Sequence, residues 1–167
     1  MKYKRIMIFG PPGAGKTTFA YKLHKKIGLP LHHLDKYFFT SCWIQRDKED
    51  FLAIQKGLVD HEHWIIDGNS VSSLEMRWER ADLVLYFNPG KLLCLSRLPL
   101  RYFQDRRHLD DRAENCPQRI SLDLITYLWG FDKRVRAKIV LLSNKYPDAT
   151  FIEISDAHTA KDMLEAL

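Results

Sequence analysis

Residues 10–17, close to the N-terminus, have the types and spacing needed to hold a chain of phosphates. They match the pattern G-x-x-x-x-G-K-[ST]. Glycines let the backbone curl until successive N–H groups point inward at a phosphate, and the following helix adds its positive N-terminal end. Lys16 supplies charge for the outer phosphates and Thr17 a hydroxyl for Mg²⁺. We therefore predict a site for ATP and Mg²⁺ made by Gly10, Pro11, Pro12, Gly13, Ala14, Gly15, Lys16, Thr17 and Thr18.

The flanking residues supply the context that this pattern requires. Residues 6–9 are apolar, as in a buried strand, and Phe19, Leu23 and Ile27 recur at helical spacing before Gly28 ends the helix. The alternative is a glycine-rich turn with no ligand. The order of strand, glycine loop and helix favours phosphate binding.

Two aspartates end later segments that we interpret as strands. Asp67 ends the run 64–66 and is predicted to hold Mg²⁺ or its waters together with Thr17. Asp35 ends the segment 31–35, which we interpret as a second short strand. Because ligands bind at the carboxyl ends of parallel strands, Asp35 is a candidate general base for an acceptor hydroxyl, or an outer-shell metal ligand. The alternative for Asp35 is a turn or helix cap.

Aromatic residues gather between Tyr37 and Trp43 without a helical or strand period. They could form the wall of an acceptor pocket, or simply cover the sheet. Arg46 could reach an anionic acceptor or lie in solvent.

The segment 104–119 mixes arginines with acidic residues and loses the apolar period. We interpret it as a lid whose arginines close over the transferring phosphoryl group; the alternative is a solvated loop. Arg97 and Arg101 precede it, four residues apart and on one face if the helix continues past Pro99. The predicted catalytic residues are Lys16, Asp35, Arg97, Arg101, Arg107 and Arg119.

Strands alternate with helices along the chain, which predicts a parallel sheet in one domain, residues 1–167. Further strands are expected at 81–87 and 150–154, with one long helix from about residue 120 to 142 that Gly130 could break. The loop 155–157 falls at the same sheet edge and could contact a nucleobase.

The composition is that of an ordinary globular domain, with 46% hydrophobic and 28% charged residues. No apolar run reaches the length of a membrane span, and the three cysteines form no C-x-x-C pair, so we expect a cytoplasmic protein without a membrane partner. The net charge of +5 admits an anionic partner, either nucleic acid or a phosphorylated small molecule.

Together these elements resemble the P-loop kinases of the adenylate-kinase-like group over essentially the whole chain. The resemblance rests on the glycine loop, on Asp67-Gly68, on the pair Arg97 and Arg101, and on Arg107, Asp110-Asp111 and Arg119 around the lid. It implies an α/β P-loop NTPase fold with a five-stranded parallel sheet, helices on both faces and a short lid.

Within that group the chain is most similar to bacterial adenylate-kinase-related or "DNA topology modulation" proteins, through Leu34-Asp35, Trp43 and residues 64–69. Adenylate kinases follow Asp-Gly with an aromatic residue, a proline and an arginine that holds the acceptor phosphate. Here Asn69-Ser70-Val71 follow, without the arginine.

Two functions follow from the sequence. The first is Mg²⁺-dependent phosphoryl transfer from ATP to an unidentified small-molecule acceptor, which could be a nucleoside, a nucleotide or another metabolite. The second is a nucleic-acid-associated ATPase or regulator, whose affinity for DNA would fall steeply with salt. The short chain, without a recognisable nucleic-acid module, favours the first.

Overall fold

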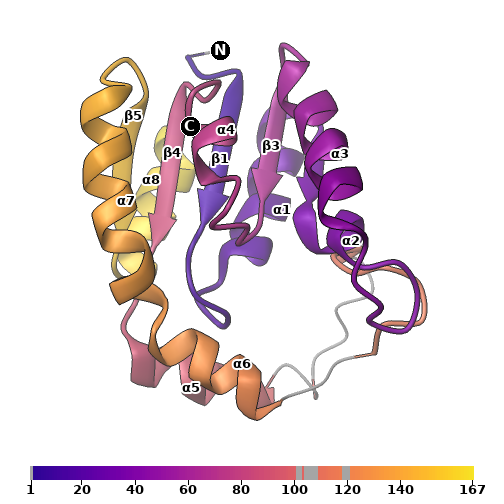
Figure 1. Ribbon diagram of the computed structural model, residues 1–167. Helices are drawn as coiled ribbons and strands as arrows, with labels where there is room; N and C mark the ends of the chain where they lie inside the picture. The colour runs from indigo at the N-terminus through magenta and orange to yellow at the C-terminus, as the bar shows by residue number, and fades with distance from the viewer. Residues whose placement is uncertain (1, 101–102, 104–108, 118–120) are drawn as a thin grey trace.

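The computed structural model describes residues 2–100, 103, 109–117 and 121–167. Its strands form one parallel sheet in the order β2-β3-β1-β4-β5 (Figure 1). The strands are β1 (Arg5–Phe9), β2 (Leu31–His33), β3 (Trp64–Asp67), β4 (Leu83–Phe87) and β5 (Thr150–Ile154). The expected five-stranded parallel α/β sheet is confirmed.

Helices occupy the connections between the strands. They are α1 (Lys16–Ile27), α2 (Leu34–Phe38), α3 (Lys48–Asp60), α4 (Leu74–Trp78), α5 (Lys91–Leu100), α6 (Leu122–Trp129), α7 (Phe131–Lys145) and α8 (Ala157–Ala166). In Figure 1, α3, α4 and α7 lie in front of the sheet, α1 and α8 lie behind it, and α5 and α6 lie below it. Within the described residues, no helix is long and apolar enough to cross a bilayer.

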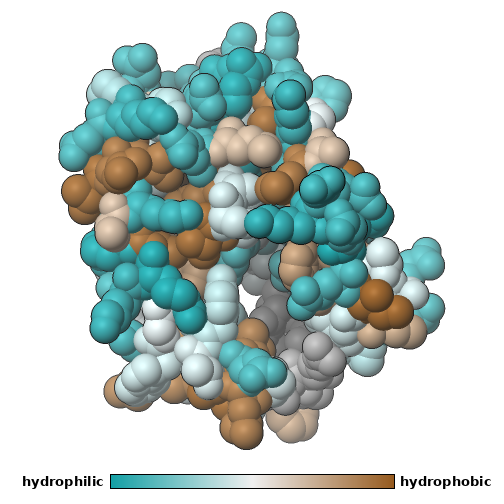
Figure 2. Space-filling view, in the orientation of Figure 1, coloured by the Kyte–Doolittle hydropathy of each residue, from teal (hydrophilic) through white to brown (hydrophobic). Residues whose placement is uncertain are grey.

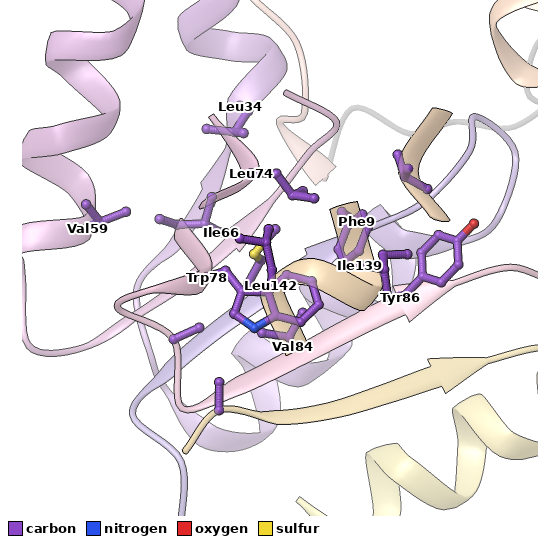
Figure 3. Close-up of a cluster of buried hydrophobic side chains, with 14 of the residues drawn as sticks. Phe9, Leu34, Val59, Ile66, Leu74, Trp78, Val84, Tyr86, Ile139 and Leu142 are labelled. Atoms are coloured by element: carbon purple, nitrogen blue, oxygen red, sulfur yellow. The ribbon is translucent and has the colours of Figure 1, made fainter. Parts of the chain in front are cut away.

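Both faces of the sheet are buried, and β1 shows how the strand alternation divides its residues between them. Met7 and Phe9 belong to the core cluster that α3, α4 and α7 cover, part of which Figure 3 shows. Ile6 and Ile8 belong to a second cluster, covered by α1, α5 and α8. A parallel strand buried on both sides needs apolar residues at every buried position, which explains why residues 6–9 of β1 are all apolar.

The strand order places β1 between β3 and β4. Ile8 pairs with Asp67 of β3, and Phe9 pairs with Tyr86 of β4. The glycine loop therefore leaves the centre of the sheet beside the ends of both neighbours. Because the connections diverge to opposite sides here, this is the crevice where open α/β sheets bind ligands.

The structure corrects one expectation and refines others. The second strand ends at His33 rather than Asp35, so Asp35 lies in the first turn of α2. The short helices α2 and α4 were not expected, because five residues are too few to display an apolar period. The long helix expected from residue 120 to 142 is divided into α6 and α7, with Gly130 between them. Pro99 lies inside α5, in its last turn.

Candidate active site

The glycine loop is held so tightly against its neighbours that side chains would not fit. A Cβ added to Gly10 would lie 2.2 Å from the Phe87 carbonyl oxygen, and one added to Gly13 would lie 2.4 Å from that of Cys94. Both residues also have positive φ, 149° and 81°. The loop therefore needs glycine at both positions, because the backbone has a positive φ there and because a side chain would clash with a neighbouring carbonyl group.

The N-terminus of α1 is open toward this loop. Gly15 occupies its N-cap, no side chain caps it, and its first turn contains no acidic residue. The unpaired N–H groups of a first helical turn are a ready anion site. Lys16 is buried and its Nζ donates to the Pro11 carbonyl oxygen over 2.9 Å, which arches the lysine back over the loop. The loop thus has the shape and charge that a phosphate chain requires.

Thr17 and Asp67 form a pair of oxygen ligands at the floor of the site. Thr17 Oγ1 donates to Asp67 Oδ2 over 2.9 Å. Asp67 is buried, and its Oδ1 has no hydrogen-bond partner within the described part of the chain. Burial would raise the pKa of Asp67, but the hydrogen bonds from His33 and Thr17 and the charge of Lys16 outweigh it and lower the pKa. A buried, ionised carboxylate with an unused oxygen beside a hydroxyl fits a hard divalent cation such as Mg²⁺.

His33 completes this cluster, and the sequence analysis gave it no role. Its Nδ1 lies 3.1 Å from Asp67 Oδ2, and register pairs the two residues across β2 and β3. Burial would lower the pKa of His33, but the hydrogen bond to Asp67 and the charges of Asp67, Asp111 and Asp35 raise it. The only sequence signal was its place near the end of the predicted strand 31–35.

Two further residues hold the loop after β3, and sequence reasoning missed both roles. Asn69 Oδ1 accepts from the backbone N–H of Gly10 over 3.0 Å, tying this loop to the phosphate loop. Arg77 of α4 is fully buried and donates to the carbonyl oxygens of Gly68 and Ser70, over 3.0 and 2.6 Å. Burial lowers the pKa of Arg77 to about 10. Nothing in the sequence around Arg77 distinguished it from a surface arginine.

A cavity of about 1220 Å³ extends along the carboxyl ends of the strands. Figure 2 shows the surface hollowed in the lower half of the molecule, below the sheet. On the β2 side it is lined by Asp35, Phe38, Phe39 and Trp43, and on the β5 side by residues 156–157 and α8. Because β2 and β5 are opposite edges of the sheet, the cavity has room for two molecules, one on each side of the glycine loop.

The described residues include one of the four predicted catalytic arginines. Arg97 lines the cavity beside the glycine loop, where its Nη1 would lie 3.9 Å from a Cβ at Gly15. Arg101, Arg107 and Arg119 lie outside the described residues, as do 104–108 and 118–119 of the predicted lid.

The described part of the lid, residues 109–117, packs on the β2 side of the cavity. Lys36 Nζ on α2 lies 2.5 Å from Asp110 Oδ2, and Trp43 Nε1 donates to the Pro117 carbonyl oxygen over 3.1 Å. Arg112 lines the cavity and its Nε donates to Asp111 over 3.3 Å. The lid and the aromatic segment thus form one wall.

A comparison with known protein families finds a match that includes the glycine loop. The model described as "ATPase family associated with various cellular activities (AAA)" matches residues 6–66, which include β1, the loop and β3 up to Ile66. A comparison with curated protein sequences finds no match.

Solved structures with similar folds include small-molecule kinases. Shikimate kinase from Acinetobacter baumannii, in complex with shikimate, has a TM-score of 0.60 at 18% identity; the alignment covers 98% of this chain and 89% of that one. Shikimate kinase from Bacteroides thetaiotaomicron has a TM-score of 0.55 at 16% identity, over 98% and 95% of the two chains. Deoxyadenosine kinase from M. mycoides with bound dATP has a TM-score of 0.53 at 15% identity, over 98% and 97%. The chain has the P-loop NTPase fold and resembles these kinases in architecture.

Proposed function

We propose that this protein transfers a phosphoryl group from ATP to a hydroxyl group of a small molecule, with Mg²⁺ as cofactor. The observation that carries the proposal is the hydrogen-bonded pair of Thr17 and the buried Asp67 beside Lys16, at the floor of a cavity with room for a nucleotide and a second molecule. Phosphoryl transfer depends mainly on positioning and on offsetting charge, and these residues do both.

The nucleotide would bind on the glycine loop, with its phosphates against the loop N–H groups and Lys16. The loop after β5, where Asp156 and Ala157 line the cavity, would then contact the base. Thr17 and Asp67 would hold Mg²⁺, which offsets charge on the β- and γ-phosphates when bound. Arg97, beside the loop, would add positive charge near the transferring group.

Asp35 would accept the proton of the acceptor hydroxyl. It is exposed in the first turn of α2 and lines the cavity on the side away from the base site. A general base must be within hydrogen-bond reach of the hydroxyl, so this position assigns the acceptor to the β2 side. Arg101, Arg107 and Arg119 keep their predicted role around the transferring group.

The test is ADP release from Mg·ATP with a panel of nucleosides, nucleoside monophosphates, polyols and hydroxy acids. Lys16→Ala should lower turnover at least 100-fold, since it removes the charge that faces the outer phosphates. Lys25→Ala is the matched control, because Lys25 is exposed on the same helix and does not line the cavity. Near-normal turnover in Lys16→Ala would reject the proposal.

Asp35→Asn tests the base. We expect it to bind ATP normally and to lose most transfer, whereas Asp60→Asn, at the exposed end of α3, should behave as the unmodified protein. Unchanged transfer in Asp35→Asn would mean that Asp35 has a structural role. If ADP release responds only to DNA, and binding weakens steeply with salt, the nucleic-acid function replaces this one.

A further inference from the structure

The β2 side of the cavity presents an aromatic surface made by Phe39 and Trp43. Phe39 and Trp43 are half-buried and line the cavity, with ring centroids 5.0 Å apart and planes at 77°. Phe38, which also lines the cavity, links these rings to the core: its ring centroid lies 4.8 Å from that of Phe39 and 5.0 Å from that of Phe51. The edge-to-face contacts fix the rings against the core, so the surface is formed before any ligand arrives.

Trp43 offers this cavity only the apolar surface of its ring. Its indole N–H, the one polar group of the side chain, donates to the Pro117 carbonyl oxygen over 3.1 Å. Its backbone N–H is also used, at 3.1 Å from Cys116 Sγ. Phe39 has no polar side-chain atom. The two rings can therefore bind a ligand by stacking and apolar contact, and not by hydrogen bonds from their side chains.

Asp35 and this aromatic surface lie close together in the chain: Asp35 is in the first turn of α2, Phe39 caps the end of that helix, and Trp43 lies in the loop that follows. Phe38 and Phe39 follow Asp35 by three and four residues, and the Phe39 N–H donates to the Asp35 carbonyl oxygen over 3.2 Å, so both lie about one helical turn from Asp35. One helical turn is about 5.4 Å long. An acceptor that reaches both must carry a hydroxyl about one helical turn from a flat ring. A nucleoside has this form, with a sugar between its base and its primary hydroxyl.

The charges on this side favour an uncharged acceptor. Asp35 and Asp111 both line the cavity here. Among the described cations of this region, Arg112 donates to Asp111, and Arg134 donates to the Tyr127 carbonyl oxygen with its guanidinium 4.5 Å from the Tyr127 ring. A carboxylate or phosphate on the acceptor would face like charges and cations that already have partners.

We propose that the acceptor is a nucleoside, whose base stacks on the Trp43 ring with the Phe39 ring beside it, while its sugar hydroxyl faces Asp35. This inference rests on the proposed kinase function. In the transfer, the hydroxyl oxygen bonds to the γ-phosphorus, the bond from that phosphorus to the β–γ bridging oxygen breaks, and ADP leaves with the electron pair. The hydroxyl proton passes to the Asp35 carboxylate.

The test compares steady-state kinetics for nucleosides, their 5′-monophosphates and shikimate. We expect at least one nucleoside to exceed its monophosphate and shikimate about 10-fold or more in kcat/KM. Trp43→Leu should raise the KM for that nucleoside about 10-fold to 100-fold, since it removes one stacking surface, and should leave kcat and the KM for ATP unchanged. Trp129→Leu is the matched control: Trp129 is 54% exposed on α6 and does not line the cavity.

Nucleoside binding is measured separately by the quenching of tryptophan fluorescence, in the unmodified protein and in Trp43→Leu. If a monophosphate or shikimate is the better substrate, or if Trp43→Leu leaves the nucleoside KM unchanged, the nucleoside inference fails while the kinase function stands. If no acceptor supports transfer but nucleosides quench Trp43, the binding site is supported and the kinase function fails. If neither is seen, both fail.

Discussion

Thr17 Oγ1 donates a hydrogen bond to Asp67 Oδ2 over 2.9 Å, across fifty positions of sequence. The contact exists because β1 and β3 are neighbours in the sheet and Ile8 pairs with Asp67, which places the end of β3 beside the start of α1. A hydroxyl and a buried carboxylate are thereby held together before any metal binds. The predictions below begin with this pair.

Thr17→Val should remove the hydroxyl while keeping the shape of the side chain. We expect turnover to fall about 100-fold or more and the Mg²⁺ concentration needed for activity to rise, because one oxygen ligand and one of the two hydrogen-bond partners of Asp67 Oδ2 are lost together. Thr17→Ser is the matched control and should keep most activity. Initial rates over a Mg²⁺ titration make the comparison, and equal rates for the two variants would contradict the metal role of Thr17.

Gly13→Ala should disrupt the phosphate loop. The new Cβ would lie 2.4 Å from the Cys94 carbonyl oxygen, at a φ of 81°, so the loop must move. We expect lower stability by about 1–3 kcal/mol and much weaker nucleotide binding.

Gly57→Ala is the control for that change. Gly57 lies inside α3, and a Cβ there would meet nothing within 4 Å. It should raise stability by about 0.5–1 kcal/mol through helix propensity. Urea unfolding and nucleotide titration distinguish the two; a Gly13→Ala protein that binds nucleotide normally would show that the loop tolerates a side chain.

Arg77→Lys should destabilise the protein by about 2–4 kcal/mol. The guanidinium is fully buried and its Nη1 and Nη2 bond to two different carbonyl oxygens, which a single ammonium on a shorter side chain cannot reproduce. The charge would remain buried with fewer hydrogen bonds. Arg80→Lys, at an exposed position just after α4, should change stability by less than about 0.5 kcal/mol. Denaturant unfolding of both variants measures the difference; equal effects would contradict a clamping role for Arg77.

Asp82 should contribute stability that acid removes. Its carboxylate accepts from the backbone N–H groups of Lys4 and Arg5 and from the Arg5 guanidinium, over 2.6 to 3.1 Å. Burial would raise the pKa of Asp82, but these hydrogen bonds outweigh it and hold the pKa below the usual 3.8. The folded state therefore binds this proton less tightly than the unfolded chain, so the contribution is present above about pH 4 and is lost as the pH falls further.

Asp82→Asn should accordingly be less stable than the unmodified protein at pH 7, and the difference should shrink as the pH falls toward 2. Urea unfolding across this range measures it. Asp148→Asn, at an exposed position before β5, provides the control with little change at either end. A difference between Asp82→Asn and the unmodified protein that stays constant with pH would contradict the argument.

The sequence was sufficient for features built from neighbouring residues. The glycine loop, with Lys16 and Thr17, is a contiguous pattern, and β1 is recognisable because a strand buried on both faces is apolar at every position. Alternating strands and helices then require a parallel sheet, which the structure confirms. Asp67 was predicted beside the loop from its place at the end of an apolar run, and the contact with Thr17 agrees.

Only the tertiary structure decided which distant residues share the site. His33 reaches Asp67 through strand register, Arg77 is buried because α4 packs under the loop after β3, and Trp43 is oriented by Pro117 from the lid. Asp35 lies on a helix rather than at a strand end, and the sequence could not indicate this because α2, with five residues, is too short to show an apolar period. Such contacts depend on register and packing between segments that are far apart in the chain, and local residue patterns carry little information about either.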